Sequence, residues 1–134
     1  MSFVGYNFKD EADAMDLACE AGSGEEFAFI SAEAKRLNCY IIYGYIEKEE
    51  KEGTVSLYNS ATLVGRDGKM EINVRKTHLF FNDKLWCKEG DGFKCVEIAN
   101  LKGEKFKCAI GICMDINPKD FTSGEWELAD FCQK

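Results

Sequence analysis

Cys113 is the residue whose position most favours chemistry. It ends the apolar segment AIGIC at 109–113, and a polar turn with Asp115, Asn117 and the only proline of the chain follows. Nucleophiles often occupy such strand-to-turn junctions, because the side chain is held outward and the following backbone N–H groups can donate to an oxyanion. A free thiol in an apolar segment more often serves packing. On this segment alone, a catalytic and a packing role for Cys113 both stay open.

A catalytic Cys113 needs an activating partner, because the thiolate rather than the thiol is the nucleophile. His78 is the only histidine and could form a Cys–His pair, although a partly buried structural histidine is the more common case. Lys76 could stabilise a thiolate or a developing oxyanion with its ammonium, or be an ordinary solvated lysine. Glu89, in the segment WCKEGDGF, could orient Lys76 or a substrate, and an exposed loop glutamate is the alternative.

Composition narrows the class of protein. The 134 residues are 46% hydrophobic with one proline, which is typical of one globular domain or part of one. A net charge of −7 argues against nucleic-acid binding, and no apolar run is long enough to span a membrane, so we expect a cytoplasmic protein. Seven cysteines without a C-x-x-C pair predict reduced thiols, with neither a zinc site nor a redox motif.

The apolar periodicity predicts the first elements that must position these residues. Alanine and acidic residues predict a short helix over 10–22, and apolar residues three and four apart predict a second helix over 25–38. The aromatic and β-branched segment 39–46 predicts a buried strand. The charged run 47–53 after it predicts a solvated turn.

Two strand pairs and a last helix follow. The pair Asp67-Gly68 predicts a tight turn, because glycine accepts the positive φ that such a turn needs. The predicted hairpins join 56–65 to 70–79 and 92–101 to 106–113, and a helix is expected within 118–134. These elements predict a layered α/β fold with helices covering a sheet. Since the helices are too few to cover a sheet buried on both faces, we expect the chain to be incomplete.

Three segments together resemble one known family. LYNSATLVGRDGKMEINVRKTHLF, WCKEGDGF and AIGICMDINP resemble, in order and spacing, the carbon–nitrogen hydrolase (nitrilase) superfamily. More narrowly, GYNF at 5–8 and CMDINP at 113–118 resemble the eukaryotic N-terminal amidases, which deamidate N-terminal asparagine and glutamine of proteins. Other branches more often have an aromatic residue after the cysteine and an arginine where this chain has Asn117.

The resemblance implies a fold and a set of roles. Residues 1–134 would be one partial domain, the central part of a nitrilase-type α-β-β-α sandwich that lacks the first strand and the C-terminal portion. Cys113 would be the nucleophile, Lys76 the catalytic lysine, and Glu89 the second glutamate that supports the lysine and substrate positioning. The backbone N–H of Met114 would belong to the oxyanion hole, and His78 would have a structural or supporting role.

The resemblance also implies partners. The substrates would be protein or peptide N-termini that carry Asn or Gln, and a homo-oligomer stays open. No metal or organic cofactor is expected, and neither nucleic acid nor a membrane is an expected partner.

One expected group has no counterpart in the sequence. The family's general base is a glutamate a few residues before the segment that matches Gly5, which would place it immediately before Met1. Glu11 and Glu47 are the nearest substitutes, and neither is expected to reach Cys113. We therefore expect this chain to be inactive on its own. Two other interpretations stay open: a hydrolase of a small amide or carbamoyl compound, and a catalytically dead form that acts as an interaction piece.

Overall fold

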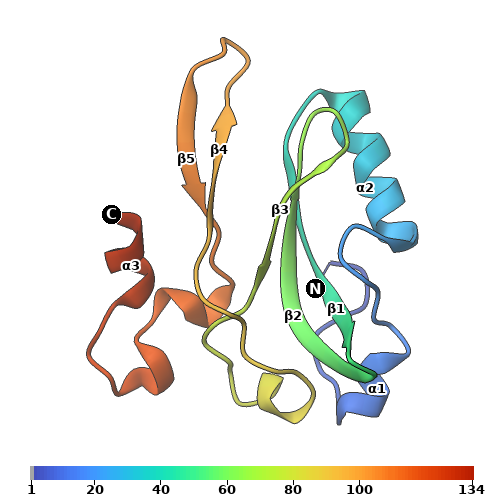
Figure 1. Cartoon of the computed structure of the whole chain (residues 1–134), viewed down its shortest axis with the longest axis vertical. Coiled ribbons are helices and arrows are strands. Elements are labelled where there is room, and N and C mark those ends of the chain that lie inside the picture. Colours follow the sequence, from blue (N-terminus) through green and yellow to red (C-terminus); the bar gives the residue numbers. More distant parts are fainter. Residues whose placement is uncertain (1) are drawn as a thin grey trace.

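The computed structural model describes residues 2–134, which form two antiparallel sheets flanked by helices (Figure 1). The first sheet has the strand order β1-β2-β3, and the second consists of β4 and β5. In chain order the elements are α1 (Glu11–Met15), α2 (Gly24–Leu37), β1 (Ile41–Lys51), β2 (Thr54–Val64), β3 (Met70–Arg75), η1 (Asp83–Leu85), β4 (Cys95–Ala99), β5 (Lys105–Ala109), η2 (Cys113–Ile116), η3 (Lys119–Phe121) and α3 (Glu127–Cys132), where η marks a 3-10 helix.

The three-stranded sheet is covered on both faces. On one face, side chains of β1 and β2 pack against Ile30 and Ala34 of α2. On the other, Ala61, Leu63 and Val74 pack with apolar residues of the β4–β5 hairpin and of the segment that follows β5. Figure 1 shows α2 and the β4–β5 hairpin on opposite sides of the sheet. This arrangement of one helical layer and two β layers confirms the predicted layered α/β class.

The helices differ in how well local sequence predicts them. α2 forms where expected and ends at Asn38, whose φ of 50° allows its backbone N–H to close the last turn. The predicted helix over 10–22 is wrong in length, because α1 ends at Met15. Beyond it, Cys19 pairs with the edge of β1: its N–H donates to Ile46 O at 3.1 Å. Pairing with a strand edge therefore replaces further helical turns.

The charged run 47–53 is not a solvated turn. β1 continues through it to Lys51, and the turn consists of Glu52 and Gly53 only. Glu47 is 2% exposed and pairs with Arg75, which reaches it from β3 across β2 and donates to it from Nε at 2.9 Å. The charge pattern predicted a turn, but most of this segment is a strand, in which Glu47 and Glu49 pair with Arg75 of β3.

In the C-terminal third, the predicted strand up to Cys113 and the predicted helix within 118–134 are both too long. β5 ends at Ala109, so residues 110–112 lead to Cys113 outside the ladder. The helix expected within 118–134 is split into η3 and α3. Asp120 and Phe121 have φ values of 53° and 61°, which end a right-handed helix. Only Glu127–Cys132 forms the expected helix.

Candidate functional site

The backbone around Lys76 brings the loop of Glu89 to the end of β3. Lys76 follows the last residue of β3, and its carbonyl accepts a hydrogen bond from Gly90 N at 2.8 Å. A Cβ at Gly90 would lie 2.4 Å from Arg75 O, so only glycine allows this approach. The loop that carries Glu89 is therefore fixed beside the backbone of Lys76.

Cys113 begins η2 in a backbone conformation that is rare for a residue with a side chain. Its φ is 49°, whereas Ile112 before it is extended with a φ of −115°. Its side chain is exposed, while Met114 after it is buried. A strained backbone conformation of this kind persists only where the surrounding structure holds it in place, and such conformations are concentrated at functional sites. The geometry is that of an elbow that presents a thiol outward.

Asp115 docks this elbow onto the residues after Lys76. One carboxylate oxygen accepts hydrogen bonds from Thr77 N at 3.0 Å and His78 N at 2.8 Å. The other oxygen accepts from Ile112 N at 2.8 Å. Asp115 is 3% exposed, so these charge-assisted hydrogen bonds are protected from water. The cysteine elbow and the chain segment of the lysine are thus held together by one side chain.

His78 ties the same region to the C-terminal helix. Its Nδ1 lies 2.9 Å from Asn117 O, and its Nε2 contacts the Glu127 carboxylate at the start of α3. The side chain is 1% exposed. Since both ring nitrogens already have partners, His78 is not placed to activate Cys113.

The side chain of Lys76 is fully buried and ends in a polar cluster. Its Nζ forms an ion pair with Asp83 and donates to the Tyr6 hydroxyl at 3.2 Å. Burial disfavours the charged lysine, but the hydrogen bonds that its ammonium donates to Asp83 and Tyr6 outweigh this effect and raise the pKa of Lys76 above its ordinary value. The ammonium therefore stays protonated. Sequence reasoning did not single out Asp83, and Tyr6 entered only as part of GYNF.

The side chain of Glu89 pairs with Lys119 and not with Lys76. Its Oε2 accepts a hydrogen bond from Lys119 Nζ at 2.8 Å, and both side chains are more than two-fifths exposed. Among residues 2–134, Asp83 is the carboxylate that meets the Lys76 ammonium. The candidate glutamate and the candidate lysine are thus neighbours in backbone and not in side-chain contact.

Of the other carboxylates considered from the sequence, one is exposed and one is occupied by hydrogen bonds. Glu11 is exposed in α1, and Glu47 accepts from Ser60 Oγ at 2.6 Å as well as from Arg75. Within residues 2–134, the buried carboxylates are Glu47, Asp83 and Asp115, and each already accepts several hydrogen bonds. We therefore assign no general base among the described residues.

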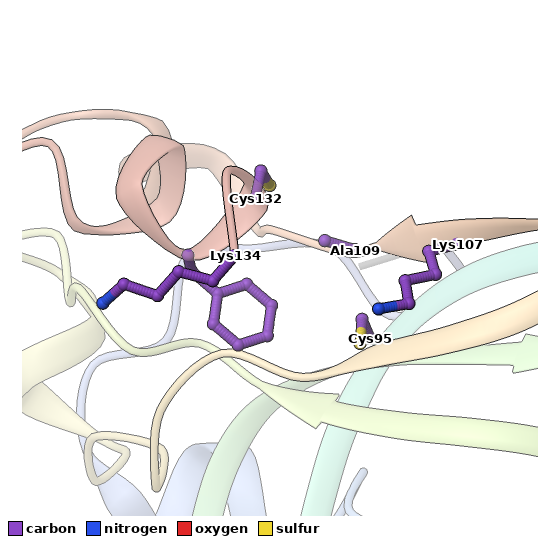
Figure 2. A pocket seen from close by; sticks show the side chains of 6 residues that line it. Cys95, Lys107, Ala109, Cys132 and Lys134 are labelled. Atoms are coloured by element: carbon purple, nitrogen blue, oxygen red, sulfur yellow. The ribbon is translucent and has the colours of Figure 1, made fainter.

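Two cavities are lined by residues that follow His78 in the chain. One of about 190 Å³ lies between the β4–β5 hairpin and α3, with Cys95 on one side and Cys132 on the other (Figure 2). None of the three candidate residues lines it. A smaller one of about 70 Å³ adjoins the elbow, since Met114 forms part of its wall.

Over residues 2–134, no group of three or more His, Cys, Asp and Glu side chains is arranged to hold a metal ion. In the same residues no helix has both the length and the apolar character needed to cross a membrane.

The chain matches known proteins over nearly its whole length. The carbon–nitrogen hydrolase family model matches residues 1–120. The protein N-terminal amidases of Saccharomyces cerevisiae and Schizosaccharomyces pombe are 30% and 32% identical, each over 98% of the chain. A crystal structure of N-terminal amidase with an Asn-Glu-Ala peptide superposes with a TM-score of 0.83 at 28% identity, over 98% of the chain.

The share of these proteins that is matched is smaller. The chain covers 32% of the S. cerevisiae relative, 46% of the S. pombe relative and 34% of the crystallised amidase. Within that share, the fold agrees with that of the crystallised amidase. The chain therefore belongs to the carbon–nitrogen hydrolase family, and what it matches is part of an N-terminal amidase.

Proposed function

We propose that these residues carry the nucleophile and oxyanion-stabilising groups of a thiol amidohydrolase, which hydrolyses the side-chain amide of N-terminal Asn or Gln. The observation that carries the proposal is the Cys113 elbow, strained at φ 49° and docked by Asp115 onto the backbone directly after Lys76. The likeness to N-terminal amidases, one of them crystallised with an Asn-Glu-Ala peptide, supports this substrate class.

In the proposed reaction the Cys113 thiolate attacks the amide carbonyl carbon. The carbonyl oxygen becomes an oxyanion, which the Lys76 ammonium and the Met114 backbone N–H stabilise. The C–N bond then breaks, and ammonia leaves with a proton while a thioester forms on Cys113. Water attacks the thioester, so the carboxylate product forms and the thiol is restored. Glu89 precedes Gly90, whose N–H pairs with the Lys76 carbonyl, and together with Lys119 it would contact the substrate.

The thiol and later the attacking water each give a proton to a general base, and the departing nitrogen takes a proton back from that base in its protonated form. In the family it is a glutamate, and the buried carboxylates of residues 2–134 are all engaged elsewhere. General-base help is worth about 10²–10⁴-fold. We therefore expect the 134-residue chain alone to hydrolyse the amide more slowly, by about 10²–10⁴-fold, than it would with a general base in place. Small carboxylates such as acetate should accelerate the reaction, because they can act as an external base.

The test measures ammonia release and the mass of the chain after incubation with an Asn-Glu-Ala peptide, with and without acetate. We expect a covalent adduct and an acetate-dependent release of ammonia, both of which disappear in Cys113→Ala. The peptide acetylated at its N-terminus serves as the control substrate and should react poorly.

Two results would overturn the proposal. If only small amides or carbamoyl compounds form the adduct, the reaction stands and the substrate class is wrong. If no amide releases ammonia in a Cys113-dependent way with acetate present, the chain is an interaction piece rather than an enzyme.

A further inference from the structure

We propose that Asp83, together with Tyr6, is the positioning device that holds the Lys76 ammonium, a role that the family resemblance assigns to Glu89. The catalytic use of the ammonium rests on the proposed function. The assignment of Asp83 and Tyr6 as its partners rests on the geometry of one buried cluster. Asp83 acts through Lys76, so it is a positioning residue and not a group that touches the substrate.

Both oxygens of Asp83 are occupied by donors from separate parts of the chain. Oδ1 accepts from the Tyr6 hydroxyl at 2.9 Å and from Asn59 Nδ2 at 3.2 Å. Oδ2 accepts from Phe80 N at 2.8 Å and from Lys76 Nζ. A carboxylate with four donors cannot rotate freely, and Asp83 is 0% exposed. The position of Nζ is therefore set by groups that are themselves fixed.

Tyr6 completes the arrangement with a defined direction of hydrogen bonding. Its hydroxyl donates to Asp83 and accepts from Lys76 Nζ at 3.2 Å. Burial raises the pKa of Tyr6, which keeps the hydroxyl protonated as this pattern requires. The N-terminal segment thus contributes directly to holding the lysine.

The contrast with Glu89 decides between the two carboxylates. Both follow Lys76 in the sequence, at separations of 7 and 13 residues. Asp83 is buried against Nζ, whereas Glu89 is exposed and paired with Lys119. A buried ammonium without a partner would lose its proton, and a neutral amine cannot stabilise an oxyanion in the same way. Asp83 is the group that satisfies this need.

The test observes the side-chain ammonium of Lys76 by NMR in a chain labelled with ¹⁵N-lysine, with the signal identified by its loss in Lys76→Met. We expect a slowly exchanging ammonium signal at neutral pH. In Asp83→Asn the signal should be lost or exchange about fivefold to tenfold faster, which is what one hydrogen bond of ordinary strength is worth. Asp83→Glu should restore it in part.

Matched variants make the result specific. Glu89→Gln and the surface variant Asp91→Asn should leave the Lys76 signal unchanged. Because Asp83→Asn removes a buried charge and could unfold the chain, Tyr6→Phe serves as a second variant that keeps the ring. It should keep the circular dichroism spectrum of the parent and speed exchange at Nζ. An unchanged Lys76 signal in folded Asp83→Asn or in Tyr6→Phe, or its loss in Glu89→Gln, would overturn the inference.

This readout needs no turnover, so the two proposals can fail separately. If the ammonium is held by Asp83 and no Cys113 adduct forms, the positioning role of Asp83 stands and the proposed amidase function is wrong. If an adduct forms and the Lys76 signal depends on Glu89, the amidase function stands and the positioning role of Asp83 is wrong.

Discussion

At the scale of single residues, Asp115 connects two segments that are 38 positions apart. Its carboxylate accepts from the backbones of Ile112, Thr77 and His78. It thereby maintains the positive φ of Cys113, which would otherwise relax toward the right-handed region. The side chain that holds the Cys113 turn is thus itself held by the backbone directly after Lys76.

We expect Asp115→Asn to destabilise the chain by about 2–4 kcal/mol, because an amide replaces three charge-assisted acceptor contacts and turns an N–H₂ toward a backbone donor. The measurement is the free energy of unfolding in urea, together with the alkylation rate of Cys113. Glu125→Gln, which removes an exposed charge near α3, is the matched control. A loss as small as that of the control would show that Asp115 does not hold the elbow.

At the scale of elements, α2 illustrates how a helix end depends on one backbone conformation. Asn38 has φ 50° and ψ 45°, and its N–H donates to Lys35 O at 3.3 Å. Asparagine tolerates this left-handed region, whereas a β-branched residue does not. The chain then turns directly into the segment that leads to β1, so the cap also sets where the sheet begins.

Asn38→Val should therefore lower the free energy of unfolding by about 1–2 kcal/mol, which is the cost of the left-handed region for a residue with a Cβ. Asn38→Gly at the same position should keep or increase stability, since glycine has no Cβ. Thermal or urea unfolding of the two variants measures this difference. Equal stability of both would mean that the helix ends in another way.

At the scale of the whole molecule, folding buries thiol and phenol groups and thereby raises their pKa values. Burial raises the pKa of the Cys87 thiol from 9.0 to about 12, and burial likewise raises the pKa of the Tyr43 hydroxyl from 10.0 to about 12. These residues belong to different apolar clusters of the molecule. Their titration thus reports on global unfolding rather than on one local site.

The sign of the pH dependence follows from these values. Between pH 9 and 12 the unfolded chain loses protons that the folded chain retains, so the free energy of unfolding falls as the pH rises. The contribution is fully present below pH 9. Lys76 acts in the same direction, because its pKa is also raised.

Urea unfolding between pH 7 and pH 10 measures this slope, and Cys87→Ala should flatten it above pH 9. Met15→Leu is the control, because Met15 packs against the same cluster and carries no titrating group. A slope in Cys87→Ala that equals that of the parent would contradict the prediction.

The sequence by itself determined what depends on neighbours in the chain. The helix over 25–38 follows from apolar residues three and four apart, and the β2–β3 turn follows from Asp67-Gly68, where Gly68 has φ 75°. These preferences act over a few residues, so one segment is enough to reveal them. The candidates Cys113, Lys76 and Glu89 came from motifs of the same short range.

The tertiary structure alone decided which of the charged groups meet. Glu47 of β1 is buried beside Arg75, which reaches it from β3 across β2, and Lys76 meets Asp83 and Tyr6 although Tyr6 and Asp83 are 77 positions apart. A charged side chain has no local pattern that distinguishes a solvated from a paired state. Its partner is chosen by the packing of distant elements, and burial then makes the pair strong because water no longer competes for it.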